Sequence, residues 1–316
     1  MSDPDEPPFW LADVTQYPVA MAAANWDAAG VNDWRDPEAA WWAKSRRART
    51  HIDDIKAMLI RFDEDTACRV DLEPTSEAGK TALRLRVLRR PPNEMLTTIG
   101  DALHNLRSCL DSVAFELASR TLGGTMTEKQ QKSVQFPTCV DKEEFDASLA
   151  QKNQRDLYGE HERSALQCAQ PFALRHEAAA EGVVFGTAPA EEYRINELVR
   201  LSRLNNLDKH RYLPLLSWYM DFAYFTSEVA ACRLDVRMRV PLQDGEVFGH
   251  LLFDPGQTDP GPALHLEMRL TFADDPGYAA GISDSLDNWH RYLTSWIVPR
   301  IFIVADGNPP PIMIAG

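Results

Sequence analysis

The chain has 316 residues, and its hydrophobic fraction of 44% and charged fraction of 25% are those of an ordinary soluble globular protein. A formal net charge of −14, from 33 basic and 47 acidic residues, argues against broad, non-specific binding to nucleic acid or to anionic membranes. No apolar run approaches the roughly 18–20 residues that a membrane helix needs. The acidic N-terminus also lacks the pattern of a signal peptide, so we expect a cytoplasmic protein without membrane contact.

The charge is unevenly distributed along the chain. Residues 1–40 carry eight acids and one base, whereas residues 41–120 carry fourteen bases and twelve acids. A local basic surface in the second stretch could therefore contact RNA despite the overall acidity. Residues 1–35 are rich in Pro and Asp but also contain Trp10, Trp26 and Trp34, so we expect an acidic arm that packs at least in part on the body.

The first predicted helix spans residues 38–62, with Asp36 as a cap and Pro37 at the first helical position. Apolar side chains recur at spacings of three and four, which predicts one buried stripe along the helix. The stripe consists of Trp41, Ser45, Ala48, Ile52, Ile55, Leu59 and Phe62, and the opposite face carries Lys44, Arg46, Arg47 and Arg49.

A β-hairpin is predicted at 68–89, because apolar and charged residues alternate on both sides of a Gly-containing link. The link, Ala78-Gly79-Lys80-Thr81, resembles the end of a phosphate-binding P-loop. Pro74 stands where that motif needs glycine, and a strand follows instead of a helix, so we reject a nucleotide-binding loop.

A second long helix is predicted at 94–119, with a stripe formed by Ile99, Leu103, Leu106, Leu110, Val113 and Leu117. Shorter helices are expected near 142–150 and 160–169, and another helix runs from about 191 to 207. Four strands are then predicted at 216–225, 232–240, 247–253 and 264–272, and their short connections indicate an antiparallel meander. A last helix spans 282–298 and ends at Pro299.

These elements predict an α+β fold in which long heptad-patterned helices form a helical bundle. We expect one compact domain, with an arm at 1–35, a helical bundle at 36–211 that includes the hairpin, a meander at 212–273 and a C-terminal helix at 281–304. The meander would be an insertion that covers one side of the bundle.

Three polar side chains flank the stripe of the second long helix: His104, Arg107 and Asp111. With Ile99 at 0°, they fall near about 140°, 80° and 120° around the helix. Asp111 could accept the imidazole N–H of His104 and fix its tautomer, and Arg107 would keep Asp111 ionised. The cluster could orient a catalytic base, bind an anion or hold helices together. We favour the structural role, because polar pairs at helical spacing are common.

The segment LNNLDKHR, residues 204–211, ends the helix that begins near 191. If the helix continues to His210, then Arg203, Asn206 and His210 share one face, and a cation lies beside a group that can move protons near neutral pH. If the helix stops at Asn206, the same residues are caps and turn formers, and the basic side chains complement the helix dipole. The sequence leaves both alternatives open.

The motifs GDALHNLRSCLD and LNNLDKHR together resemble a signature of a group of uncharacterised bacterial proteins, over most of the chain from about residue 40. This resemblance implies no activity. The second motif is also similar to that of HEPN domains, helical bundles that include RNA-cleaving toxins and defence proteins. In the HEPN motif an Arg is followed, after four to six residues, by a His, and Arg203 and His210 match this spacing. Asp111 or His104 could stand for the supporting polar residue on the second helix. Leu204 departs from that pattern, which usually has Asn, Asp or His after the Arg, and a meander is not a HEPN feature.

The HEPN resemblance implies metal-independent RNA cleavage without a cofactor. His210 would act as general acid or base on the ribose 2′-hydroxyl and the leaving oxygen, and Arg203 would hold the scissile phosphate. His104, Arg107 and Asp111 would bind or orient, and the remaining binding residues would be Asn206, Asp208 and Arg211. Two copies, paired through their helical faces, would complete one groove.

Two other functions are compatible with the sequence. A metal hydrolase that uses His104, Asp111, Asp208 and His210 is disfavoured, because neither HExxH nor paired ExxH spacing occurs. The stronger alternative is a non-enzymatic binding module, in which the polar clusters join helix to helix and the sheet or the arm contacts a partner. An enzyme should gather its residues around one open cleft, whereas a structural role predicts that they are buried and bonded to one another.

Overall fold

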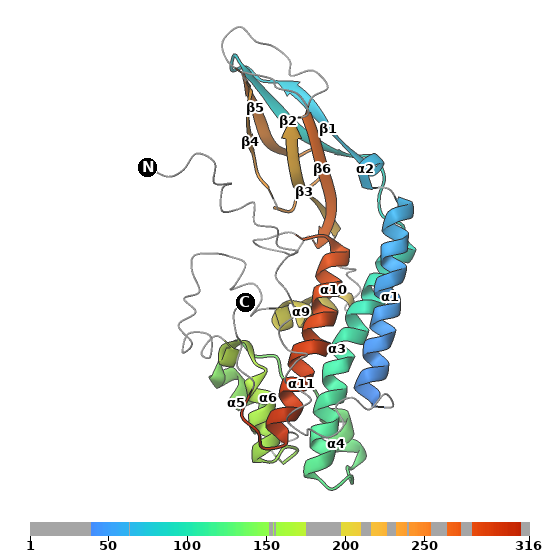
Figure 1. Ribbon diagram of the computed structural model, residues 1–316, viewed down its shortest axis with the longest axis vertical. Helices are drawn as coiled ribbons and strands as arrows, with labels where there is room; N and C mark the ends of the chain where they lie inside the picture. The colour runs from blue at the N-terminus through green and yellow to red at the C-terminus, as the bar shows by residue number, and fades with distance from the viewer. Residues whose placement is uncertain are drawn as a thin grey trace.

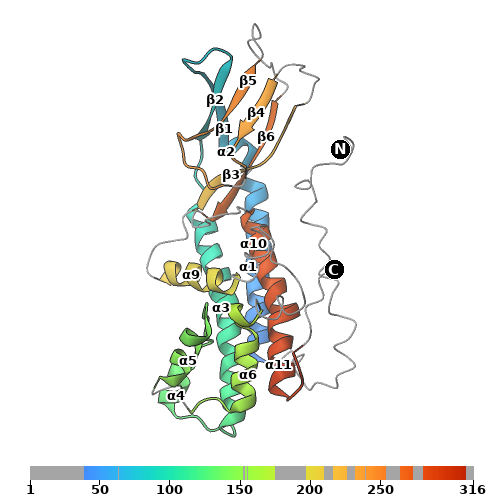
Figure 2. The same ribbon diagram turned by 90° about the vertical axis from the view of Figure 1, so that its left-hand side faces the viewer.

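The computed structural model describes residues 39–62, 64–151, 154, 156–174, 197–209, 216–225, 232–238, 240–253, 264–272 and 280–310. It is an α+β fold in which the long helices run side by side and the strands gather at one end of them (Figures 1 and 2). The predicted arm at 1–35 lies outside the described residues. In the described part, no helix is long and apolar enough to cross a membrane.

The two longest helices, α1 (Ala40–Phe62) and α3 (Asn93–Thr121), pack against each other along their length (Figure 1). The stripe predicted for α3 is buried at every position, from Ile99 to Leu117. In α1 the predicted stripe is also buried, except that Leu59 is only half-buried. Spacing of three and four residues places these side chains on one line of each helix, so the two lines meet and exclude water.

The predicted hairpin is present as β1 (Cys68–Pro74) and β2 (Lys80–Val87), which follow the short helix α2 (Glu64–Ala67). Gly79 forms the turn with a φ of +74°, a left-handed conformation that favours glycine. A Cβ atom there would lie 2.9 Å from the carbonyl oxygen of Phe253, so the neighbouring strand also requires glycine. The segment that resembles a P-loop is therefore a hairpin turn.

The prediction of a consecutive meander is wrong, although the four strands lie close to where the alternation places them. They are β3 (Leu216–Phe225), β4 (Cys232–Val236), β5 (Val247–Phe253) and β6 (Leu264–Phe272). One sheet has the order β1-β2-β5-β4, and β3 pairs with β6 in a separate two-stranded sheet, with all pairs antiparallel. β5 pairs with the preceding strand, β4, along one edge and with β2 along the other, so it covers the edge of β2 that a lone hairpin would leave unpaired.

The strands also lie at the end of the helices instead of covering one side of them (Figures 1 and 2). The strand predicted at 232–240 is shorter in the structure, because β4 ends at Val236; Leu234 and Val236 on it are half-buried. Met238 and Val240, which lie beyond the end of β4, are exposed.

Short helices surround the lower part of α3: α4 (Glu128–Ser133), α5 (Lys142–Ala150) and α6 (Glu160–Cys168). Helix α9 is described from Glu197 to Lys209 and crosses the long helices (Figure 2). It continues past Asn206, so the alternative in which the helix stops at that residue is wrong.

The C-terminal helical segment ends close to the limit of 304 expected for it, but the prediction that Pro299 ends its helix is wrong. Helix α10 (Ile282–Tyr292) passes into one wide π-helical turn, η5 (Leu293–Ile297), and then into α11 (Val298–Ala305). A proline inside a regular α-helix lacks an N–H donor and clashes with the carbonyl of the preceding turn. The wide turn directly before Pro299 changes that spacing, so the helix can continue and bury residues 298–304.

Candidate functional site

Arg107 lies at the centre of a polar cluster that joins α3 to two other segments. One terminal nitrogen, Nη1, donates to the hydroxyls of Thr138 at 2.8 Å and of Ser202, on α9, at 3.2 Å. The other, Nη2, donates to the carbonyl of Phe136 and lies 3.1 Å from Asp111. The Arg107 side chain is only 12% exposed, and its burial lowers its pKa although Asp111 opposes this.

Asp111 completes the same cluster from one turn further along α3. Its carboxylate accepts the backbone N–H of Phe136 at 3.0 Å and pairs with Arg107. The Arg107 guanidinium also lies 5.9 Å from the ring centroid of Phe136. Arg107 and Asp111 together therefore join residues 136–138 and helix α9 to α3.

His104 takes no part in this cluster. It is exposed, and its Nε2 lies 3.4 Å from the hydroxyl of Ser108 on the same helix. The expected hydrogen bond from His104 to Asp111 is wrong, because Asp111 is bonded to Arg107 and to the Phe136 backbone instead. His104 and Asp111 are seven positions apart, and the Asp111 carboxylate is bonded to the guanidinium of Arg107 and to the backbone N–H of Phe136.

The candidate residues on α9 are exposed where their side chains are described. Arg203 and Asn206 both lie on the exposed side of α9, whereas Leu204 and Asn205 are buried. His210 and Arg211 lie outside the described residues, as does the side chain of Asp208. The structure thus joins α9 to α3 through Ser202 and Arg107. Of the predicted catalytic pair, Arg203 and His210, only Arg203 is among the described residues.

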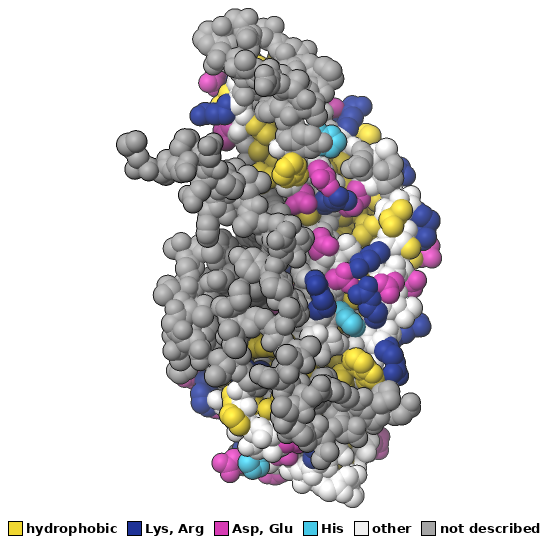
Figure 3. All heavy atoms as spheres, in the orientation of Figure 1, with side chains coloured by type: hydrophobic (Ala, Val, Ile, Leu, Met, Phe, Trp, Pro, Cys, Tyr) yellow, Lys and Arg dark blue, Asp and Glu magenta, His cyan; other side chains and the backbone are white. Residues whose placement is uncertain are grey.

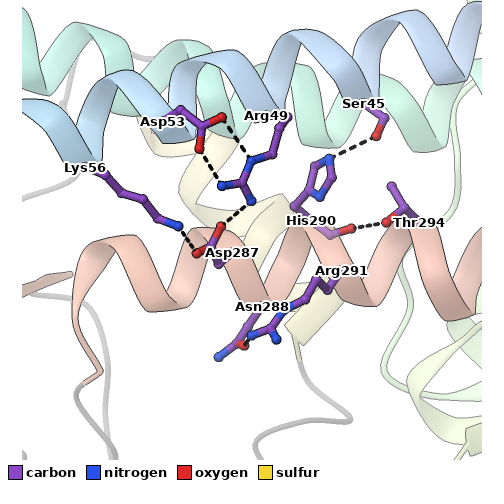
Figure 4. A network of polar contacts seen from close by, with 9 residues as sticks. All are labelled: Ser45, Arg49, Asp53, Lys56, Asp287, Asn288, His290, Arg291 and Thr294. Carbon is purple, nitrogen blue, oxygen red and sulfur yellow. Dashed lines mark hydrogen bonds and ion pairs between the residues drawn. The ribbon is translucent and has the colours of Figure 1, made fainter. Parts of the chain in front are cut away.

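A network between α1 and α10, which the sequence analysis did not predict, is shown in Figure 4. Arg49 on α1 pairs with Asp53 and, at 2.7 Å, with Asp287 on α10, and Lys56 pairs with the second oxygen of Asp287. The hydrogen bond from Arg49 lowers the pKa of Asp53. Arg49 was expected on the face away from the core, but its position beside the stripe lets it reach the neighbouring helix.

His290 extends this network towards the start of α1 (Figure 4). Its Nε2 lies 3.1 Å from the hydroxyl of Ser45, and its carbonyl accepts the hydroxyl of Thr294 at 2.8 Å. Burial, and then the positive charge of Arg49, lower the pKa of His290, whereas Ser45, Asp287 and Asp53 oppose that shift. In the sequence, the only sign of this network is the pattern Asp-x-x-His at 287–290, beside the apolar stripe of the last helix. The pattern does not show which helix lies opposite, so the partners on α1 could not be inferred from it.

A second cluster, between α9, β6 and α10, is mainly buried. Glu197 accepts the indole N–H of Trp289 and lies 3.9 Å from Arg200. The Arg200 guanidinium stacks over the rings of Trp289 and Phe272, with 5.1 Å and 6.0 Å to the centroids. These contacts satisfy the charges inside the fold and hold α9 against α10.

The described cysteines are core residues. Cys68, Cys109 and Cys139 are buried, and Cys168 is half-buried. Burial raises the pKa of the Cys109 thiol to about 12 and that of Cys139 to about 11, so both are neutral at pH 7 and poor nucleophiles. Within the part of the chain that the structure describes, no group of three or more His, Cys, Asp or Glu could hold a metal ion.

Acidic and basic side chains are interspersed on the right-hand part of the face in Figure 3, where α1 and α10 lie, so this visible part does not form a field of one sign. Comparison with protein-family models, with curated proteins and with solved structures gives no match.

Proposed function

We propose that this chain is a non-enzymatic binding module, in which a helical scaffold presents a partner protein with the end of the molecule that holds strands β1–β6, here called the sheet end. The observation that carries the proposal is the state of Arg107. Both of its terminal nitrogens are bonded to protein atoms, so its charge holds α9 on α3 instead of meeting a substrate. In this proposal α1, α3 and α10 act together as a heptad-patterned bundle.

The exposed apolar side chains support the choice of the sheet end. Among the described residues, six large hydrophobic side chains at or near the strands are between 37% and 81% exposed: Ile60, Leu72, Leu88, Phe222, Met238 and Val240. The other two exposed large hydrophobic side chains in the described part of the chain, Phe115 and Val140, lie away from the strands. Ion pairs of Arg84 with Glu73 and of Arg86 with Asp71 lie on β1 and β2 at the same end of the molecule, and protein interfaces commonly combine apolar and charged side chains.

Metal-independent RNA cleavage is the second candidate function, and one observation favours it. Helix α9 continues to Lys209, and Arg203 and Asn206 both lie on its exposed side. In this candidate, His210 would move the proton and Arg203 would hold the scissile phosphate, with a second copy completing the groove.

Incubation of the purified protein with total RNA in EDTA separates the two functions. The binding module predicts no cleavage by the native protein, by Arg203→Ala or by His210→Ala, and a monomer by light scattering. Cleavage by the native protein that is lost in His210→Ala, with an unchanged circular dichroism spectrum, would overturn the proposal in favour of the nuclease.

A further inference from the structure

A pocket of about 330 Å³ lies where the end of α1, the link after β2 and the start of α3 meet. Its volume is at the lower end of the range for small-molecule sites. The lining residues come from all three segments and are Met58, Arg61, Phe62, Arg89, Arg90, Pro92 and Glu94. Three of them are arginines and one is acidic, so the lining carries a formal charge of +2.

Arg61 and Arg90 are exposed, and neither has an ion pair or a side-chain hydrogen bond within the described part of the chain. Most other arginines on this side of the molecule are paired, such as Arg84 with Glu73 and Arg86 with Asp71. Two unpaired guanidinium groups at the mouth of one pocket can both turn towards a bound anion, and the fork of each matches the oxygens of a carboxylate or a phosphate.

Arg89 is fixed as one wall of the same pocket. Its Nη2 donates to the carbonyl of Phe62 and, at 2.9 Å, to the hydroxyl of Thr66. Its guanidinium lies over the Phe62 ring, 5.2 Å from the centroid, and that ring stacks in turn on Trp218 at 6.4 Å. The backbone N–H of Arg89 donates to the carbonyl of Ala67 at 3.0 Å. This wall of the pocket, formed by Arg89 and Phe62, is therefore preformed, which reduces the entropy lost on binding.

We propose that this pocket binds the phosphate group of a small phosphate monoester. A monoester carries a charge of about −1.5 to −2 at pH 7 and so balances the lining charge, whereas a carboxylate would neutralise about half of it. The apolar side chains of Met58, Phe62 and Pro92 leave room for a short apolar group next to the phosphate. The proposal depends on the pocket alone and goes beyond the binding of a partner protein.

Calorimetric titration of the full chain with phenyl phosphate at pH 7.5 tests this proposal, with phenyl sulfate as a probe of the same shape and a single charge. We expect phenyl phosphate to bind at least about tenfold more tightly than phenyl sulfate. Arg61→Gln and Arg90→Gln should each weaken binding of phenyl phosphate by about tenfold, because each removes one charged hydrogen-bond donor. Glu94→Gln should tighten binding, since it removes the acid in the lining.

Arg47→Gln is the matched control, because Arg47 is exposed on the same helix about four turns, or about 21 Å, before Arg61. Its affinity for phenyl phosphate should equal that of the native protein. Equal binding of phenyl phosphate and phenyl sulfate, or equal loss in Arg47→Gln and Arg61→Gln, would overturn the proposal. Tight binding of a short RNA oligonucleotide, whether or not it carries a 5′-phosphate, would also overturn it and would indicate a nucleic-acid surface.

Discussion

His290 makes the stability of the α1–α10 contact dependent on pH. Its folded-state pKa is lowered by burial and by Arg49, so below pH 6.5 the unfolded chain binds a proton that the folded chain does not. The contribution of neutral His290 to the free energy of unfolding should therefore be complete above pH 6.5, and it should decrease as the pH falls below that value. For one proton the slope is at most about 1.4 kcal/mol per pH unit.

Urea unfolding at several pH values between 7.5 and 5 measures this effect. His290→Gln, which can still bond to Ser45 but does not titrate, should show a smaller loss of stability with falling pH than the native protein. His161→Gln is the control, because His161 is exposed on α6. Identical slopes for the native protein and His290→Gln would contradict the role assigned to the imidazole.

Asp284, in the first turn of α10, has the opposite effect. Burial, Asp221 and Asp287 raise its pKa from the ordinary 3.8, so the folded state loses stability as the pH rises above 3.8, and the loss is complete above the raised pKa. Because Asp284 is exposed, solvent screens this effect, and we expect Asp284→Asn to raise the free energy of unfolding at pH 7.5 by about 0.5 kcal/mol at most. The gain should shrink as the pH falls through the raised pKa. A loss of stability at pH 7.5 in chemical denaturation would refute this account.

At the scale of the elements, Gly249 tests the position of β5 between β2 and β4. A Cβ atom there would lie 2.6 Å from the carbonyl oxygen of Asp235 and 2.9 Å from the Cα of Val236, both backbone atoms of β4. Gly249→Ala should therefore push the two strands apart and cost about 1–3 kcal/mol of stability in thermal unfolding. An alanine variant as stable as the native protein would mean that β4 and β5 are not paired in this register.

The extent of most elements could be predicted from the sequence, because period-two and period-3.6 patterns are local. The strand Leu264–Phe272 and the stripe of α3 follow directly from such patterns. The continuous helix through Pro299 could not be predicted, since proline normally breaks a helix and the π-helical turn that accommodates it depends on burial of residues 298–304 by the rest of the fold.

At the scale of the whole molecule, the strand order could not be predicted from the sequence. Alternation gives the face of a strand but not its neighbour, so the pairing of β2 with β5, more than 160 residues apart in sequence, has no local signal. The candidate site was limited in the same way. Arg107 and Asp111 were identified as a pair, but their partners Phe136, Thr138 and Ser202 are 25 or more positions from them in sequence.

The measurement that tests the account most directly is a double-mutant cycle of Arg107→Met and Asp111→Asn in urea unfolding, with His104→Ala as the control on the same helix. We predict that Arg107→Met costs about 2–4 kcal/mol, below the upper values for buried ion pairs because Asp111 is 33% exposed. The pair should couple by about 1–2 kcal/mol, and His104→Ala should stay within about 0.5 kcal/mol of the native protein. Full stability in Arg107→Met would contradict the structural role of the cluster and return Arg107 to the candidates for binding a substrate.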